Sequence, residues 1–255
     1  MLQPQSQAAQ TRRSIADIDD TAVVDPAEWY QRRLAEERDS GEPELGILPL
    51  LVPAGATVLD VGTNLGLFAF AMSKWAAHVK GFEPHPELAT FAQRMLAGRA
   101  QIHATAVSDY VGHGRFRVPY TDDEEVLHFA GNLCSSHSQC ERYDEYDVDV
   151  VTLDSLNFVG VRFIKVDVEG AELQVLAGAN ALIACDRPIL LVELLAGTYA
   201  DPAGAVEAIA TTYNYDPFIL HAGCFEPARE IIAGLNSNST WGSIYKTRNV
   251  LFRPK

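Results

Sequence analysis

Positive charge is scarce in this sequence. Its 255 residues contain 20 Lys and Arg against 34 Asp and Glu, which gives a formal net charge of −14. A protein that binds a nucleic-acid backbone or an anionic membrane needs a basic surface, and a strongly acidic chain repels both. We therefore expect no nucleic acid and no membrane as partner. A neutral or cationic small molecule stays open as the ligand.

Long apolar runs and closely spaced cysteine pairs are also missing. No apolar stretch approaches the roughly 20 residues that cross a bilayer, and the N-terminal residues lack the apolar core of a signal peptide. The four cysteines include no C-x-x-C pair, so the sequence does not predict a structural zinc site. We expect a cytoplasmic protein, and nothing in the sequence indicates its oligomeric state.

What the sequence does contain is a regular alternation of strand and helix patterns. Strands that alternate with helices of about 10–15 residues form βαβ units, and helices cover both faces of the resulting parallel sheet. The predicted fold class is therefore α/β. We predict strands at residues 57–61, 78–82, 101–107, 162–166, 189–194, 218–220 and 250–252, and helices at 65–77, 86–97, 171–184 and 203–213.

The N-terminal part of the chain differs from this pattern. Residues 1–24 are polar and aperiodic, and we interpret them as a flexible tail. Asp25 and Pro26 then begin a helix, as its cap and its first-turn proline. No linker and no internal repeat follow, so we interpret residues 25–255 as a single domain.

An insert at residues 114–153 interrupts the alternation before the fourth strand. It contains short β-like runs around a polar loop. Within it, residues 121–149 hold nine acidic residues and one basic residue, a net charge of −8 out of −14. Because loops on an α/β scaffold carry specificity, we predict that this insert is a substrate lid. Its charge favours a neutral or cationic acceptor.

A glycine turn follows the first strand, in the sequence D-V-G-T-N-L-G at residues 60–66. Gly62 permits a sharp turn, and the start of the next helix offers unpaired N–H groups to an anionic group. The spacing is G-x-x-x-G, and Asn64 stands where a dinucleotide-binding loop has its second glycine. The turn therefore predicts a ligand site and argues against NAD.

Polar residues also follow the second and third strands. Glu83 comes 23 residues after Asp60, where nucleoside-binding α/β domains carry an acid that accepts hydrogen bonds from the ribose hydroxyls. The third strand ends in Ser108 and Asp109, which would place small polar groups beside an adenine. Both positions favour a nucleoside ligand at this edge of the sheet.

The fourth strand carries charges where an apolar sequence is expected. Lys165, Asp167 and Glu169 alternate with apolar residues, so their side chains share one face at the carboxyl end of the strand. The next strand ends in Glu193, at the same edge. Burying charge is costly unless the charge is paired or used, and ligands of open α/β sheets bind at this edge. These residues are therefore the candidate catalytic groups.

Together these segments resemble the FkbM family of S-adenosylmethionine-dependent methyltransferases, above all in I-K-V-D-V-E-G-A-E at 164–172. The resemblance covers roughly residues 55–195 and implies a Rossmann-like class I methyltransferase fold with a seven-stranded, mostly parallel sheet. It also implies O-methylation of a hydroxyl on a small molecule, sugar or natural product. The residues that it assigns to S-adenosylmethionine are Asp60, Gly62, Thr63, Asn64, Gly66, Glu83, Pro84 and Ser108.

Methyl transfer to a hydroxyl requires alignment of the reacting atoms and a base that takes the proton. Asp167 is the first candidate for the base or for a group that positions the acceptor. Lys165 would keep Asp167 ionised or lower the pKa of the acceptor hydroxyl, and Glu193 is the second candidate base. Asp167 and Glu193 could also share Mg²⁺, which suits carboxylate-rich sites, although the sequence does not require a metal.

Two other functions stay open at this point. One is a nucleotide-dependent enzyme of another class, such as an NAD-dependent oxidoreductase, against which the missing middle glycine argues. The other is a catalytically inactive methyltransferase fold that acts as a binding module. The charges at Lys165 and Asp167 argue against this second alternative, because an inactive domain has little reason to keep buried charge.

Overall fold

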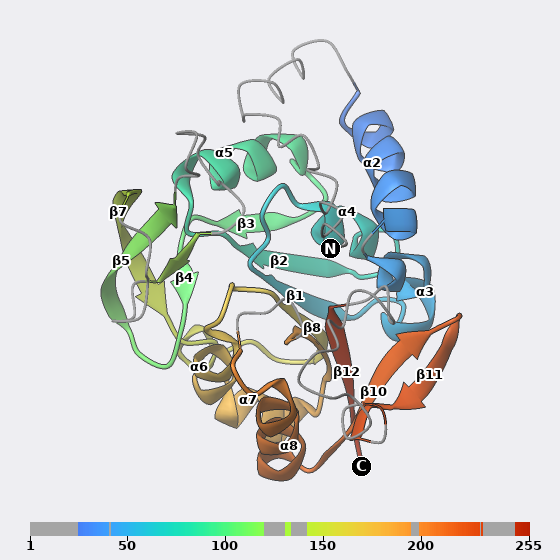
Figure 1. Ribbon diagram of the computed structural model, residues 1–255. Helices are drawn as coiled ribbons and strands as arrows, with labels where there is room; N and C mark the ends of the chain where they lie inside the picture. The colour runs from blue at the N-terminus through green and yellow to red at the C-terminus, as the bar shows by residue number, and fades with distance from the viewer. Residues whose placement is uncertain are drawn as a thin grey trace, which may run out of the picture.

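The computed structural model describes residues 25–40, 42–119, 131–133, 142–194, 199–229, 231 and 248–255 (Figure 1). The predicted tail at 1–24 lies outside the described residues, as do residues 120–130 and 134–141 of the predicted lid. None of the helices in the described ranges is both long and apolar enough to cross a bilayer.

The central feature is a mixed sheet of eight strands in the order β11-β10-β12-β9-β8-β1-β2-β3. The five strands from β9 to β3 are parallel, whereas β12 runs antiparallel to both of its neighbours. This arrangement confirms the α/β, Rossmann-like class. The strands are β1 (Thr57–Val61), β2 (His78–Phe82), β3 (Gln101–His103), β8 (Val161–Val166), β9 (Ile189–Glu193), β10 (Tyr215–His221), β11 (Cys224–Pro227) and β12 (Asn249–Pro254).

The eighth strand is an addition to the seven that we predicted. β11 pairs with β10 through the two-residue turn of Ala222 and Gly223, and both residues have positive φ angles, 47° and 81°. Two-residue hairpins favour this left-handed backbone because it matches the twist of the strands. The strand is absent from the prediction because Ala-Gly is a weaker hairpin signal than Asn-Gly.

Helices cover both faces of the sheet, as predicted (Figure 1). Residues on alternating positions of β8 and β9 explain this, since Phe163 and Leu191 belong to one apolar cluster whereas Ile164 and Leu190 belong to the other. The first face carries α2 (Pro26–Ser40), η2 (Pro43–Gly46), α3 (Leu48–Leu51), α4 (Leu67–Met72) and α5 (Pro86–Met95). The second carries α6 (Glu172–Ala177), α7 (Asn180–Asp186) and α8 (Pro202–Tyr213).

The helix predicted at 171–184 is in fact two helices, α6 and α7. The break falls at Gly178, where a Cβ atom would lie 2.0 Å from the carbonyl oxygen of Ser108. The backbone of the Ser108 segment therefore approaches the chain too closely for any side chain. The short helix η4 (Asp154–Leu156) lies against the same region, because Asp154 accepts hydrogen bonds from the backbone N–H groups of Ala181 and Leu182.

The insert before β8, together with the residues just before it, forms a second, four-stranded sheet in the order β4-β7-β5-β6. The strand predicted at 101–107 is divided, because β3 stays in the main sheet whereas β4 pairs with β7. Part of the acidity of the insert is neutralised here, since Glu145 forms ion pairs with Arg115 and Arg117. The strands are β4 (Ala106–Val107), β5 (Gly112–Pro119), β6 (Asn132–Leu133) and β7 (Tyr143–Val151).

The N-terminal helix α2 is anchored to the glycine turn. Asp25 caps the helix as predicted, with its Oδ1 accepting from the backbone N–H of Ala27 at 2.8 Å. Tyr30 is fully buried and stacks on Phe70 of α4 with ring centroids 4.5 Å apart. Its hydroxyl donates to the carbonyl oxygen of Leu65 at 2.7 Å. The helix thus supports the segment that follows β1.

Replacing Tyr30 by Phe tests this anchor. The change keeps the ring but leaves the buried carbonyl of Leu65 without its donor, so we expect a loss of about 1–2 kcal/mol in the free energy of unfolding. Urea denaturation measures the loss, and Tyr110→Phe is the control because Tyr110 is exposed. Equal stability of Tyr30→Phe and the wild type would show that the hydroxyl does not anchor α2.

Candidate active site

The glycine turn lies where β1 meets β8, at the point where the strand order changes direction. Gly62 has φ 82°, and a Cβ atom there would lie 1.7 Å from the carbonyl oxygen of Asp167. Gly66, with φ 87°, leaves room for the side chain of Leu96 and for the hydroxyl of Tyr30. Both glycines are therefore required by close packing, and ligands of open α/β sheets bind beside such a switch point.

The remaining residues of the turn hold its shape. Thr63 donates from its hydroxyl to the carbonyl oxygen of Asp60 at 2.8 Å. Asn64 has φ 53°, a left-handed backbone that Asn tolerates better than most residues. Its Oδ1 accepts from the N–H of Leu65 at 2.7 Å. The side chains of Thr63 and Asn64 are thus engaged with the turn itself.

Glu83 connects the turn to α5. Its Oε2 accepts from the N–H of Asn64 at 2.7 Å and its Oε1 accepts from the N–H of His85 at 2.8 Å. Burial raises the pKa of Glu83 to about 7 in spite of these hydrogen bonds. Each carboxylate oxygen has a second lone pair, so Glu83 can still accept from a ligand hydroxyl. A structural role therefore accompanies the predicted ribose-binding role.

Asp60 and Lys165 are direct neighbours in the pairing of β1 with β8. Each is 1% exposed. Burial raises the pKa of Asp60 to about 7, against the opposing effect of the Lys165 charge. The Oδ2 atom of Asp60 is buried and has no hydrogen-bond partner among the described residues. Asp60 therefore has an unused acceptor beside the glycine turn.

The three predicted catalytic residues lie together at the carboxyl end of β8 and β9. The Lys165 Nζ donates to Asp167 Oδ2 at 3.1 Å, and a carboxyl–carboxyl hydrogen bond connects Glu193 with Asp167. Burial acts to raise the pKa of Asp167, but Lys165 and this hydrogen bond hold it below its ordinary value. Burial and the Asp167 charge raise the pKa of Glu193 well above its ordinary value of 4.5. Asp167 is therefore the ionised member of the pair.

Two further charged residues reach this cluster from outside the predicted motifs. Arg248, just before β12, has its Nε 3.2 Å from Glu193 Oε1 and its Nη2 3.8 Å from Glu42 Oε1. Glu42 precedes η2, and its Oε2 accepts from Asn249 Nδ2 at 2.7 Å. Burial raises the pKa of Glu42 to about 7. The signal for Arg248 and Asn249 in the sequence is that both directly precede the apolar run at 250–252, which is predicted as a strand of the same sheet.

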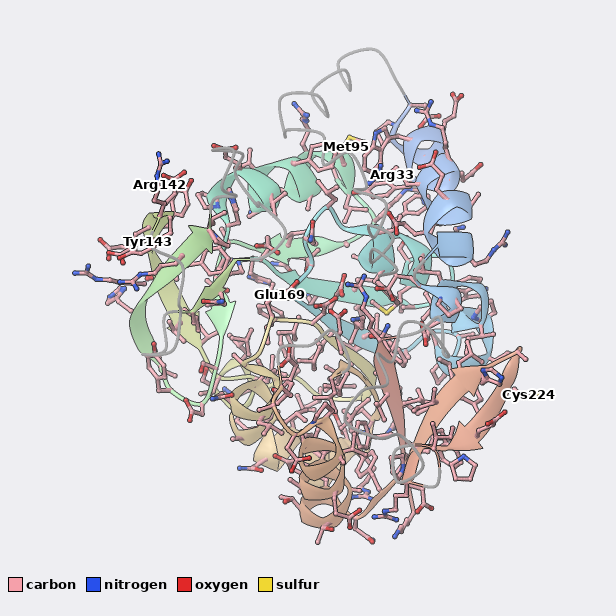
Figure 2. All side chains as sticks on the ribbon, in the orientation of Figure 1. Arg33, Met95, Arg142, Tyr143, Glu169 and Cys224 are labelled. Carbon is pink, nitrogen blue, oxygen red and sulfur yellow. The ribbon has the colours of Figure 1, made fainter. Side chains whose placement is uncertain are left out.

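Two acids of the segment after β8, Glu169 and Glu172, have different surroundings. Glu169 has φ 55°, an uncommon backbone for a non-glycine residue, and burial raises its pKa to about 7. Figure 2 labels it near the middle of the molecule. Glu172 instead braces the segment, because its Oε1 accepts from the N–H groups of Val168 and Gly170 and its Oε2 from the Tyr199 hydroxyl.

The structure places Ser108 and Pro84 near this edge without giving them a ligand role. Ser108 is buried after β4, and its N–H donates to the carbonyl oxygen of Val151 at 3.0 Å. Pro84 is half-buried between Glu83 and the start of α5. Their assignment to the cofactor stays a prediction.

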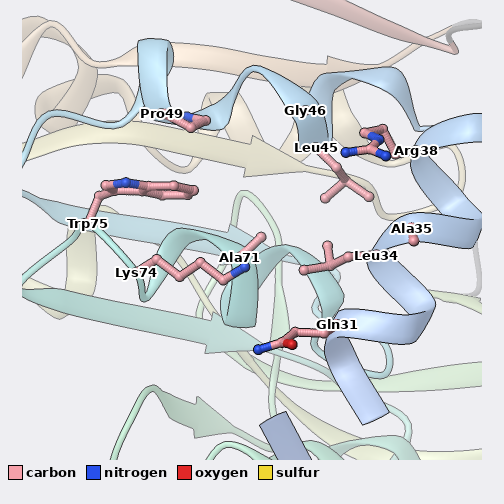
Figure 3. Close-up of a pocket in the computed structure, with 10 residues that line it drawn as sticks. All are labelled: Gln31, Leu34, Ala35, Arg38, Leu45, Gly46, Pro49, Ala71, Lys74 and Trp75. Atoms are coloured by element: carbon pink, nitrogen blue, oxygen red, sulfur yellow. The ribbon is translucent and has the colours of Figure 1, made fainter. Parts of the chain in front are cut away.

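A pocket of about 270 Å³ lies elsewhere, between α2 and the end of α4 (Figure 3). Figure 3 shows Trp75 at one end of it and Arg38 at the other. The carbonyl of Trp75 accepts from the N–H of Gly55, which precedes β1. The pocket is therefore at the opposite end of β1 from the glycine turn, so we do not assign it to the candidate active site.

The carboxylates of Glu42, Asp167 and Glu193 each have an oxygen within 4.8 Å of the others, a spacing that a divalent cation could use. Positive charge is already supplied there by Lys165 and Arg248. The carboxylates therefore have counter-ions within the protein, and we do not assign them to a metal.

Comparison with protein families adds a direct identification. Residues 60–217 match the methyltransferase FkbM domain. The match covers more than half of the chain and includes the glycine turn, Glu83, Lys165, Asp167 and Glu193. Glu42 and Arg248 lie outside it. A search of curated proteins finds no match.

Distant similarity to solved methyltransferases accompanies this match. An FkbM methyltransferase from Methylobacillus flagellatus is 16% identical, with a TM-score of 0.47 over 78% of this chain and 43% of that one. The chain thus spans less than half the length of that protein. A TehB-like SAM-dependent methyltransferase from Corynebacterium glutamicum is 15% identical, with a TM-score of 0.47 over 95% of this chain and 100% of that one. A putative methyltransferase from Streptococcus mutans, in complex with SAH, is 10% identical, with a TM-score of 0.42 over 83% and 94%.

The raised pKa of Glu193 makes a prediction about stability. A carboxyl that is protonated in the folded protein but ionised in the unfolded chain costs stability as the pH rises above about 4.5. Glu193→Gln imitates the protonated carboxyl and removes this cost. We expect the variant to be more stable than the wild type at pH 7 by up to about 3 kcal/mol, and the difference to vanish near pH 4.

Chemical denaturation at several pH values measures this difference. Glu28→Gln is the control, because Glu28 is exposed on α2. If the stabilities of Glu193→Gln and the wild type have the same pH dependence, then Glu193 is ionised in the folded protein and is not the protonated member of the Asp167–Glu193 pair.

Proposed function

This chain belongs to the FkbM methyltransferase family, and from that premise we propose that it transfers a methyl group from S-adenosylmethionine to a hydroxyl of a small acceptor. The observation that carries the proposal is the position of Asp167. Its backbone N–H donates to Val61 at 2.9 Å, and its carbonyl lies against Gly62. The proposed base is thus joined directly to the turn that would hold the cofactor.

The residues of the turn suit the chemistry of S-adenosylmethionine. The molecule carries an ammonium, a ribose diol and a sulfonium, whose methyl group it supplies to the acceptor when bound. The unpartnered Oδ2 of Asp60 suits the ammonium, and the carboxylate of Glu83 suits the ribose hydroxyls. The acidic surroundings also favour a ligand with positive charge.

Asp167 is the best candidate to take the proton of the acceptor hydroxyl. Lys165 keeps its carboxylate ionised, so it can accept a proton at neutral pH. Glu193 is protonated in the ligand-free protein and is only 5% exposed, so it is less suited to act as the base. Asp167 is 27% exposed, so its carboxylate is accessible to an acceptor, whereas the side chain of Lys165 is 1% exposed.

The acceptor should be neutral or cationic. Among the described residues, the edge of the sheet combines Glu42, Asp167 and Glu169 with two cations, Lys165 and Arg248. A phosphorylated sugar would bring further negative charge into this partly buried site, at a cost that increases as water is excluded. We therefore favour the hydroxyl of an uncharged sugar or natural product, or of an amine-bearing molecule.

Ligand-dependent stability distinguishes this proposal from its alternatives. We expect S-adenosylhomocysteine (SAH), the product that methyl transfer leaves, to raise the melting temperature, because a ligand at about 100 times its Kd adds about 2.7 kcal/mol to stability. NAD should leave the melting temperature unchanged, because Asn64 occupies the place of the glycine that a dinucleotide loop needs. Differential scanning fluorimetry measures both effects. Stabilisation by NAD alone would favour an oxidoreductase, and stabilisation by neither would overturn the cofactor assignment.

Substitution of the proposed base separates binding from chemistry. Asp167→Asn should bind SAH with nearly unchanged affinity but lose about 10²–10⁴-fold in kcat, because a general base contributes that much to proton transfer. The assay is methyl transfer to a panel of sugars and polyketides. The matched control is Asp216→Asn, a half-exposed acid on β10 paired with Lys255. Turnover by Asp167→Asn near that of the control would remove Asp167 from the chemistry.

A further inference from the structure

The acids at the carboxyl edge outnumber the cations that face them. Glu42, Asp167 and Glu193 lie within 4.8 Å of one another, and in the part of the chain that the structure describes Lys165 and Arg248 are the cations that form ion pairs with them. No neighbouring element offers another cation among the described residues. The further charged groups that the described residues place around the cluster are acids: Asp60 on β1, Glu83 after β2, Glu44 in η2, Glu169 after β8 and Glu172 in α6.

The two cations contact the Asp167–Glu193 pair unequally. Lys165 is 1% exposed and makes a hydrogen bond to Asp167, so its charge acts through a low dielectric. Arg248 is 50% exposed, and water screens its contact with Glu193. Two buried carboxyl groups in contact cannot both ionise without a large repulsion, and a single proton removes it. The unequal cations put the negative charge on Asp167 and the proton on Glu193.

We propose that Glu193 is a positioning residue, and that the proton it shares with Asp167 is lost when the sulfonium cofactor binds and regained during methyl transfer. This inference rests on the proposed function. The reason is electrostatic. A cation bound near the pair favours the ionised form of both carboxyl groups and so displaces the shared proton, and the proton returns when that cation is neutralised.

The charges before and after methyl transfer are consistent with this role of Glu193. The bond from sulfur to the methyl carbon breaks and leaves its electron pair on sulfur, while a lone pair of the acceptor oxygen forms the new bond to the methyl carbon. The acceptor's O–H proton passes to Asp167 and is shared with Glu193. The charge lost at sulfur thus reappears as a proton on the pair, so the net charge of the site is unchanged.

Counting protons tests the inference without an identified acceptor. S-adenosylmethionine and SAH are titrated into the full chain at about pH 7.5, by calorimetry in two buffers that differ in ionisation enthalpy. We expect binding of the sulfonium to release roughly one half to one proton more than binding of SAH. Glu193→Gln should bind both ligands and abolish the difference, whereas Glu28→Gln on the exposed face of α2 should retain it.

A second variant, Asp167→Asn, keeps the inference testable if Glu193→Gln does not fold. In Asp167→Asn, Lys165 and Arg248 face Glu193 as the one ionisable member of the pair, so Glu193 should stay ionised and the difference should again be lost. Equal proton release for the two ligands in the wild type would overturn the inference. So would a difference that persists in Glu193→Gln, because the proton would then belong to another acid. If neither ligand binds, the proposed function fails and this inference fails with it.

Discussion

The burial of the Lys165 ammonium is the constraint on which the site depends. This side chain is 1% exposed, and the residues before and after it in the strand, Ile164 and Val166, are apolar and fully buried. A buried ammonium without partners costs several kcal/mol, so acids must surround it. Asp60 provides one from β1 and Asp167 another from the end of β8, while Glu42 and Glu193 act on it from two other parts of the chain. The cluster at the sheet edge is thus the environment that one buried cation requires.

The backbone, rather than the side chains, fixes how this cluster meets the glycine turn. The N–H of Asp167 bonds to Val61, and the carbonyl of Asp167 leaves no room for a Cβ at Gly62. A displacement of the turn would therefore displace Asp167 as well. Catalysis by alignment needs reacting groups held within fractions of an ångström, and a shared backbone contact supplies that rigidity without mobile side chains. The anchor of α2 on the carbonyl of Leu65 supports the same turn from the other side.

Local patterns predicted the parts of this arrangement that are local. The bounds of β1 and β2, the cap at Asp25 and the charged alternation at Lys165 and Asp167 follow from periodicity and turn chemistry. Glu42 and Arg248 could not be predicted in this way, because only the packing of η2 beside β12 brings them together. The division of the helix at Gly178 has a similar origin, since it depends on a carbonyl that lies 70 residues earlier in the chain.

An acid-rich edge of this kind costs stability, and the cost points to function. Burial raises the pKa of Asp60, Glu83 and Glu169 to about 7, so each makes the folded protein less stable as the pH rises from about 4 toward neutrality. Apolar residues of similar size would avoid this cost, as replacements of buried charge in other proteins do. A cation that binds among these acids would lower their pKa values and restore stability. The excess of acids therefore supports the proposed binding of a positively charged ligand at this edge, and folding stability would be coupled to the occupancy of that site.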